Sequence, residues 1–200
     1  QVLFYLSGIT LWNYFSSCLT GTSNIFTANA SIFGKVYFPR LVMPITIVIS
    51  NLMKFGVQFT LFLAVWIFYF SKGQIEPNIW ILATPFLIVL MAIFALGVGM
   101  IFSALTTKYR DLQMLLTFGV SLMMYATPVI YPVSSITGVW KKLAYYNPLT
   151  GIFECFKYGW MGQGEFTIEM LLISTGIILV LLVIGTVTFN KVEKSFMDTV

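Results

Sequence analysis

The stretch that decides the fold runs from residue 80 to residue 105 and reads WILATPFLIVLMAIFALGVGMIFSAL. It carries no charged residue, and it exceeds the ~20 apolar residues that a helix needs to cross a bilayer. Four further stretches qualify as spans, and they lie at about 1–24, 47–70, 113–131 and 169–190. Strands that cross a membrane are shorter and alternate in polarity. The sequence therefore predicts an all-α integral membrane protein, a multi-span helical bundle in a single transmembrane domain over 1–200.

The composition excludes an ordinary soluble domain and several kinds of enzyme. Of the 200 residues, 58% are hydrophobic and 9% are charged, whereas soluble domains carry about 25% charged residues. Histidine is absent, and the two cysteines, Cys18 and Cys155, lie too far apart for a metal-ligand spacing. We expect both cysteines to be buried thiols that pack as small hydrophobic groups. The chain has no glycine-rich phosphate loop, so any energy source must lie on another chain.

Lysine and arginine near the span ends predict the orientation, because they are more frequent in cytoplasmic loops. The predicted cytoplasmic side collects the larger group, which consists of Lys35, Arg40, Lys54, Lys108, Arg110, Lys191 and Lys194. This majority places segment 25–46 and the C-terminus in the cytoplasm and segment 132–168 outside. It also places Gln1 outside, which indicates that a sixth span precedes this chain and that the domain is truncated at its N-terminus.

Segment 25–46 contains a conspicuous turn that reads Lys35-Val36-Tyr37-Phe38-Pro39-Arg40-Leu41-Val42-Met43-Pro44. Its two prolines restrict the residues before them and interrupt regular hydrogen bonding. Such a kinked element would present Tyr37, Phe38 and Arg40 rigidly, which suits docking to another protein. The alternative is an anchor at the membrane interface, where aromatic and cationic side chains are also favoured.

The outer segment 132–168 is too long and too apolar for a simple loop. Asn147-Pro148 is a turn and helix-start signal, and apolar residues then recur at helical spacing for about thirteen residues, too few to span. We therefore predict a re-entrant helical hairpin. Within it, Glu154 and Lys157 are three residues apart and can face each other. They form either a pair that holds an outer gate shut or a surface pair on the polar face of the helix.

Three further features each have two interpretations. Lys108-Tyr109-Arg110-Asp111 forms a second cytoplasmic turn. It is either a functional contact or only a set of cations that holds the turn on the cytoplasmic side, with an Arg–Asp pair that contributes little at a surface. Lys54 lies two to three turns inside a span, so it is either functional or reaches back to the headgroups. Small residues at every fourth position of 80–105 indicate close helix packing inside the chain or a homodimer seam; they are Ala95, Gly99 and Ser103.

Aromatic residues are dense, and those near the outer side are the better candidates for touching a substrate. Ring faces can stack on the apolar faces of sugars, and they also stack on each other and sit in lipid belts. The outer cluster consists of Tyr125, Tyr131, Trp140, Tyr145 and Tyr146.

With these features in order, the chain resembles the permease subunits of ABC-2-type exporters, in the branch that exports O-antigen, capsule or teichoic acid chains. The matching positions are Asn29, Lys35 to Pro44, Tyr109-Arg110-Asp111-Leu112, Thr127 to Pro132, Asn147-Pro148, Glu154, Lys157, Val192 to Phe196 and Asp198. An arginine is more usual in this family where the chain has Lys157, and lysine lacks the planar fork of arginine. The motifs are specific through their order and spacing.

The resemblance implies a homodimer of six-span permeases with two ATP-binding subunits. ATP and Mg would bind the partner subunits, and this chain would hold no cofactor and no metal. Coupling to the ATPase subunit would use Asn29, Lys35, Tyr37, Phe38, Pro39 and Arg40, beside a second cytoplasmic turn at Tyr109, Arg110 and Asp111. The outer gate would comprise Tyr145, Tyr146, Asn147, Pro148, Glu154, Lys157 and Trp160, with Tyr125, Tyr131 and Trp140 as candidates for glycan contact.

The expected function is therefore a channel-forming permease, not an enzyme, that moves a lipid-linked polysaccharide such as O-antigen across the bacterial inner membrane. An ABC-2 exporter of a drug or small lipid is the alternative within transport. A membrane-embedded transferase would need a cluster of catalytic polar groups, and the acidic residues here are few and scattered. A purely structural scaffold would have no ATPase partner.

Overall fold

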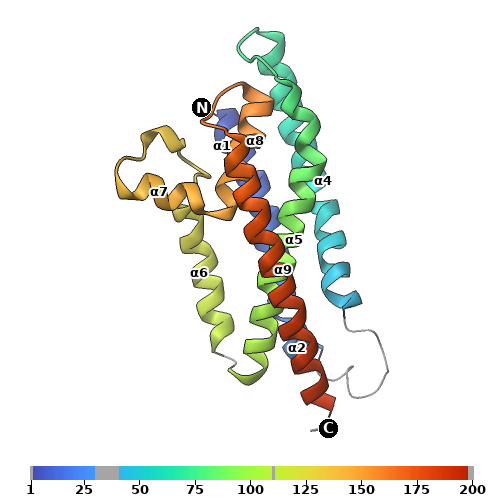
Figure 1. Cartoon of the computed structure of the whole chain (residues 1–200). Helices are drawn as coiled ribbons and strands as arrows, with labels where there is room; N and C mark the ends of the chain where they lie inside the picture. Colours follow the sequence, from blue (N-terminus) through green and yellow to red (C-terminus); the bar gives the residue numbers. More distant parts are fainter. Residues whose placement is uncertain (1, 30–40, 110, 198–200) are drawn as a thin grey trace.

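The computed structural model describes residues 2–29, 41–109 and 111–197, without the side chains of 108 and 193–197. These residues form a bundle of helices, most of which stand side by side, and they contain no strand (Figure 1). The prediction of an all-α, multi-span helical bundle is confirmed. Several residues of the two predicted cytoplasmic turns and one of the C-terminal tail lie outside the described residues. They are Lys35, Tyr37, Phe38, Pro39, Arg40, Arg110 and Asp198.

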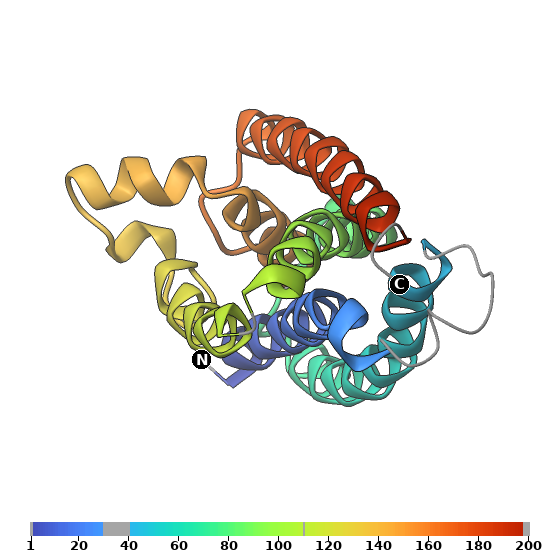
Figure 2. The same ribbon diagram turned by 90° about the horizontal axis from the view of Figure 1, so that it is seen from below.

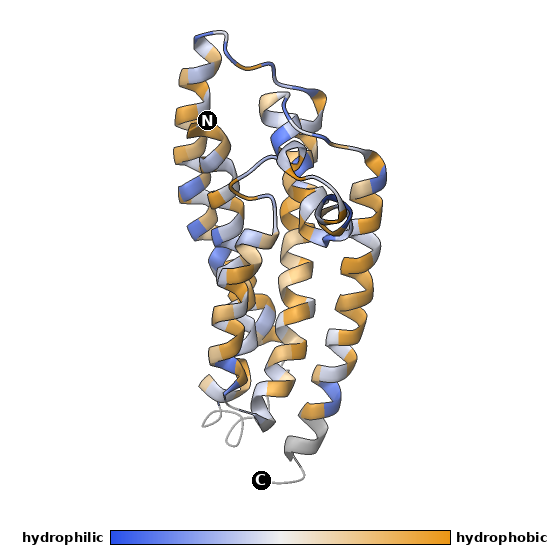
Figure 3. Ribbon diagram, turned by 90° about the vertical axis from the view of Figure 1, so that its left-hand side faces the viewer, coloured by the Kyte–Doolittle hydropathy of each residue, from blue (hydrophilic) through white to orange (hydrophobic). Residues whose placement is uncertain are grey.

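Four helices are long: α1 (Val2–Ser23), α4 (Val42–Ser71), α5 (Thr84–Lys108) and α9 (Ile168–Met197). The shorter ones are α2 (Ile25–Ala28), α6 (Leu112–Ala126), α7 (Val139–Tyr146) and α8 (Pro148–Met161). Two 3-10 segments, η1 (Ile79–Ala83) and η2 (Val133–Ser135), precede α5 and α7. The hydropathy colouring in Figure 3 shows that the long helices are predominantly apolar along their length.

Among the described residues, three helices are long and apolar enough to cross a membrane, namely Val42–Ser71, Ile79–Thr107 and Ile168–Val192. They overlap the stretches 47–70, 80–105 and 169–190. Helix α1 occupies most of stretch 1–24 and lies between α4 and α5 with twelve of its 22 residues buried. Helix α6 stops short of residue 131 because Thr127 precedes a proline and is therefore extended.

The two ends of the bundle carry different sets of segments. Helix α2, the turn between α5 and α6 and the C-terminus of α9 lie at one end, which is the lower end in Figure 1. Helices α7 and α8 and the start of α1 lie toward the other end. Helix α7 projects sideways from the bundle, and the view along the long axis of the bundle also shows this (Figure 2). The predicted outer hairpin and α2, which begins the predicted coupling segment, are thus at opposite ends.

Helices α5 and α9 cross at a point where both carry glycine. A Cβ added to Gly185 would lie 2.3 Å from the carbonyl oxygen of Gly97. The nearby stripe of small residues faces into the chain, because Ala95 and Ser103 are fully buried and a Cβ on Gly99 would lie 2.6 Å from Thr22 Cβ. The stripe therefore packs α5 inside the bundle, and its interpretation as a homodimer seam is wrong.

Aromatic side chains hold α8 against α4. The rings of Phe62 and Phe156 lie 5.6 Å apart, and those of Phe62 and Trp160 lie 5.4 Å apart. The indole Nε1 of Trp66 donates to the Trp160 carbonyl oxygen at 2.7 Å. Aromatic residues of α4 thus pack against α8 inside the bundle. Both cysteines are buried free thiols, as expected.

Candidate functional site: an outer polar cluster

The polar cluster that we consider the candidate site forms where α8 begins beside the end of α6. Asn147 caps α8, because its side-chain oxygen accepts a hydrogen bond from Leu149 N at 3.0 Å. Its amide nitrogen donates to Thr127 Oγ1 at 3.1 Å, and Thr127 follows the last residue of α6. The predicted helix start at Asn147-Pro148 is confirmed, and one side chain joins the two helix ends.

Helix α8 is wedged into the bundle on nearly all sides. A Cβ on Gly151 would lie 2.7 Å from the Met170 carbonyl oxygen of α9. A Cβ on Gly159 would lie 2.8 Å from the Trp80 backbone of η1. Twelve of its 14 residues are buried. Because backbone packs against backbone on two faces, α8 is a fixed element and cannot swing as a lid by itself.

Lys157 lies inside this packing with a side chain that is only 1% exposed. Its Nζ donates to the Pro128 carbonyl oxygen at 2.6 Å and lies 3.7 Å from the centre of the Phe4 ring. An ammonium over an aromatic face is attracted by the ring quadrupole. Burial disfavours the charged form and lowers the pKa of Lys157 to about 8, although the nearby Glu154 acts in the opposite direction.

Val129, in the segment that follows α6, also packs against α1. A Cβ on Gly8 would lie 2.3 Å from the Val129 carbonyl oxygen, so only glycine allows this approach. Lys157 also approaches Val129, with 3.5 Å between Nζ and the carbonyl oxygen. The turn that ends α6 is therefore clamped between α1 and α8.

Glu154 is as deeply buried as Lys157, with 1% of its surface exposed. Its Oε2 accepts a hydrogen bond from Glu165 N at 3.0 Å, and its Oε1 has no hydrogen-bond partner in the described structure. Burial raises the pKa of the Glu154 carboxyl, and the charge of Lys157 partly offsets this effect.

Glu154 and Lys157 do not form the direct pair that their spacing predicted. Within the described residues the ion pair found is Lys141–Glu165, and Lys157 instead donates to the carbonyl of Pro128. The prediction of a surface pair is also wrong, because both side chains are buried. The physical reason is that each group satisfies a backbone group from another segment. The two charges still attract each other without contact.

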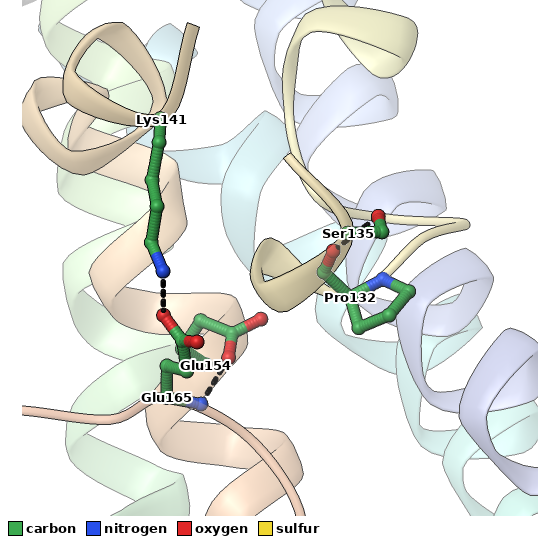
Figure 4. Close-up of polar contacts among 5 residues, drawn as sticks. All are labelled: Pro132, Ser135, Lys141, Glu154 and Glu165. Carbon is green, nitrogen blue, oxygen red and sulfur yellow. Dashed lines mark hydrogen bonds and ion pairs between the residues drawn. The ribbon is translucent and has the colours of Figure 1, made fainter. Parts of the chain in front are cut away.

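Helix α7 is held to this cluster by exposed contacts. Lys141 Nζ lies 2.7 Å from Glu165 Oε2, and both side chains are 44% exposed. Tyr145 OH donates to Glu169 Oε2 at 3.3 Å. Exposed ion pairs contribute at most about 1 kcal/mol. Figure 4 shows Lys141 reaching down to Glu165, whose backbone N–H donates to Glu154. Helix α7 is thus attached more weakly than α8.

A cavity of about 610 Å³ opens beside the cluster. Four segments line it: the start of α1, the chain after α6, α8 at Glu154 and the loop between α8 and α9. Figure 4 shows that the unpartnered oxygen of Glu154 points away from Glu165, toward the side on which Pro132 lies. The lining residues are Phe4, Tyr5, Ile130, Pro132, Val133, Ser134, Glu154, Gln163, Gly164 and Glu165.

Comparison with known proteins places these features in a family. The sequence model of the ABC-2 type transporter family matches residues 2–161, which include α1 to α8. The chain belongs to the ABC-2 type transporter family. It is an integral membrane protein.

Three relatives of this ABC-2 transporter chain carry the same name. Two proteins of Klebsiella pneumoniae, each called O-antigen export system permease protein RfbA, are 33% and 31% identical to the chain. Each match covers 98% of the chain and 74% of the relative. A Myxococcus xanthus protein with this name is 30% identical over 66% of the chain and 50% of its own length.

The structure does not bring the predicted outer residues of the ABC-2 transporter chain into one site. Tyr145 and Tyr146 belong to α7, Asn147 caps α8 in a partly exposed position, and Lys157 is buried. Trp160 lies in the aromatic core, where its Nε1 donates to Thr84 Oγ1 at 2.9 Å. The candidates for glycan contact are exposed at Tyr125 and Trp140, and Tyr131 donates its hydroxyl to the Tyr125 carbonyl oxygen at 2.8 Å.

Of the residues predicted for coupling to an ATPase subunit and for the second cytoplasmic turn, the structure describes the side chains of Asn29, Tyr109 and Asp111 only. Asn29 ends α2, and its side chain donates to the Ile25 carbonyl oxygen at 3.1 Å. Tyr109 follows α5 with about half of its side chain exposed, and Asp111 precedes α6 without a side-chain capping bond. Lys54 is exposed on α4.

The sequence analysis did not single out Phe4, Gln163 and Glu165, which line the cavity beside Glu154. Nothing local marks Phe4, since it is one aromatic residue in an apolar stretch. Gly162 and Gly164 flank Gln163, and both have positive φ, 66° and 140°, which favours glycine. A turn placed directly after a buried helix could have suggested that its backbone N–H groups serve the charges on that helix.

Proposed function

We propose that this chain is the permease subunit of an ABC exporter that moves O-antigen, or a related lipid-linked glycan, across the bacterial cytoplasmic membrane. The observation that carries the proposal is the match to O-antigen export permeases over 98% of the chain at 33% identity. Its ABC-2 family membership and its apolar helices support it. ATP hydrolysis on a separate subunit would supply the energy.

We propose the following assembly for the exporter. Two copies of this chain enclose the path of the glycan, and two ATP-binding subunits bind ATP and Mg on the cytoplasmic side. The C-terminus, segment 25–46 and the turn around Tyr109, Arg110 and Asp111 face that side. The placement of α2 and the α5–α6 turn at one end of the bundle is compatible with a single docking face.

The proposed outer gate divides into a fixed part and a movable part. Helix α8, with Asn147, Glu154, Lys157 and Trp160, forms a rigid frame because it is buried in the bundle. Helix α7 carries Tyr145 and projects from the bundle on exposed contacts. Motion during export would therefore be concentrated in α7, whose exposed aromatic residues, including Trp140, can contact the passing glycan.

The proposed function can be tested in cells that make a lipid-linked O-antigen and lack their own copy of this permease. Expression of this chain with its ATP-binding partner should restore O-antigen at the cell surface, detected by antibody on intact cells. Without the partner, the glycan should accumulate inside. If surface glycan stays absent while the chain is inserted and bound to its partner, the proposed substrate is wrong.

The double substitution Phe38→Ala and Arg40→Ala should uncouple export from ATP hydrolysis. We propose that these side chains dock on the ATP-binding subunit, so their removal should leave membrane insertion intact and reduce surface O-antigen at least tenfold. Truncating an aromatic or arginine side chain at the centre of a protein–protein interface typically costs about 2 kcal/mol or more, which corresponds to about 30-fold or more. Met43→Ala in the described start of α4 is the control. Normal export by the double variant would refute the docking role.

A further inference from the structure

We propose that the cavity beside Glu154 binds one sugar unit of the glycan at the outer end of the permease. This inference rests on the proposed function, because it assumes that the transported chain is a glycan. It goes beyond that function by naming a subsite within a single subunit. The observations that carry it are the shape of the cavity, the chemistry of its lining and one unpartnered buried oxygen.

The polar lining of the cavity is rich in hydrogen-bond acceptors. Ser134, Glu154, Gln163 and Glu165 supply hydroxyl, carboxylate and amide groups, and no lysine or arginine is among the lining residues described. An anionic ligand such as a phosphate would meet the carboxylates of Glu154 and Glu165, and Lys141, which lies beside them, is already paired with Glu165 and does not line the cavity. A neutral ligand that is rich in hydroxyl groups suits this lining better.

The Oε1 atom of Glu154 is the anchor that a ligand would use. It is buried and has no hydrogen-bond partner in the described structure, whereas buried polar atoms in proteins nearly always have one. The other oxygen, Oε2, is fixed by Glu165 N at 3.0 Å. The carboxyl group therefore keeps its orientation, with Oε1 turned toward the side of Pro132 that lines the cavity.

A sugar hydroxyl fits this anchor in either protonation state of Glu154. A hydroxyl donates one hydrogen bond and accepts others. It can donate to the ionised carboxylate, and it can accept from the protonated carboxyl that burial of Glu154 favours. An ammonium group can only donate, so it would satisfy the ionised form alone.

The size and the aromatic wall of the cavity also suit a sugar. Ligand pockets typically measure about 300–1,000 Å³, and this one measures about 610 Å³. Phe4 and Tyr5 line it from α1, and their rings offer apolar faces on which a sugar ring can stack. The segments that line the cavity lie at the end of the bundle that carries α7 and α8, where the proposed path ends.

The test uses photo-crosslinking in cells that export the glycan through the complete transporter. A benzophenone side chain is placed at Ser134 or at Gln163, which are exposed and line the cavity. The control position is Ile79, which is 76% exposed and does not line it. The probe is the lipid-linked O-antigen that the cells make. We expect antibody-detected glycan adducts at both cavity positions and at least tenfold fewer at Ile79.

A second set of variants tests the anchor. Glu154→Met should reduce the adducts at Gln163 about tenfold, which corresponds to the loss of one hydrogen bond to a charged group. The matched control is Glu76→Met, because Glu76 is an exposed carboxylate in the loop before η1 that does not line the cavity. If Glu154→Met prevents insertion, the comparison of Ser134, Gln163 and Ile79 in the otherwise unchanged chain still decides the question.

The outcomes separate the subsite from the proposed function. Export with no glycan adduct at either cavity position would overturn the subsite and leave the function intact. Adducts with phospholipid alone would also overturn it, as would equal adducts at all three positions. A chain that exports no glycan under any condition would overturn the function itself. A cavity filled only by water would also give no glycan adduct at either cavity position, and it would overturn the subsite.

Discussion

Replacing Gly185 with alanine is expected to push α5 and α9 apart and to destabilise the bundle by about 3 kcal/mol, the upper part of the usual range for overpacking. The added Cβ would lie 2.3 Å from the carbonyl oxygen of Gly97. A backbone oxygen cannot rotate away as a side chain can, so the two helices must separate along their contact. Close approach through small residues is a main source of helix association in membranes.

The measurement for this prediction is the thermal unfolding of the purified protein in detergent. Gly176→Ala is the matched control, because Gly176 lies on the same helix and an added Cβ there meets nothing within 4 Å. The control should be unchanged or up to about 1 kcal/mol more stable, since alanine favours the helix. Equal destabilisation of the two variants would show that the contact with Gly97 is not decisive.

Replacing Lys157 with methionine is expected to destabilise the end of the bundle that carries α7 and α8 by about 3 kcal/mol, the upper part of the range for a buried acceptor left without its donor, and to abolish export. Removing one partner from a set of buried charges leaves the other uncompensated, and this is the costly step. In this chain the remaining charge would be Glu154, which is 1% exposed. The carbonyl of Pro128 would also lose its donor at 2.6 Å, which frees the turn after α6.

Two comparisons identify the cause of this loss. Lys157→Arg keeps the charge and should retain most of the stability and export. Adding Glu154→Gln to Lys157→Met should recover part of the stability, because it removes the uncompensated carboxylate while an amide oxygen can still accept from Glu165 N. Lack of any recovery would show that the hydrogen bond to Pro128, and not the charge of Glu154, decides the effect.

The pH dependence of stability gives an independent test. The pKa of Lys157 falls from 10.5 to about 8 in the folded state, so the folded state binds fewer protons than the unfolded state between these values. The free energy of unfolding should therefore rise with pH above 8 in the wild-type chain. Lys157→Met should lack this contribution, and thermal unfolding at pH 7.5 and 9 measures the difference.

Much of the fold follows from local sequence signals. The apolar stretch 80–105 predicts a spanning helix because burying about twenty apolar residues in lipid requires a helix. Asn147 and Pro148 predict the start of α8 because one caps the helix and the other fits its first turn.

The site was predictable only in part. Glu154 and Lys157 are conspicuous as charges in an apolar segment, but their partners come from elsewhere in the chain. Lys157 binds the carbonyl of Pro128, 29 residues earlier, and lies over Phe4 at the start of the chain. Spacing along one helix suggested that the two charges pair with each other, whereas each is closer to a backbone group of another segment.

The sequence by itself determined that this chain crosses a membrane in helices and which branch of transporters it resembles. The helices depend on hydrophobicity and capping, which act over a few turns of the chain, and the resemblance depends on the order and spacing of short motifs. The tertiary structure alone decided that α8 is a fixed buried element, that α7 is the weakly held one, and that a cavity lies beside Glu154. These properties depend on contacts between α1, the end of α6 and α8, and such contacts exist only once the helices are packed together.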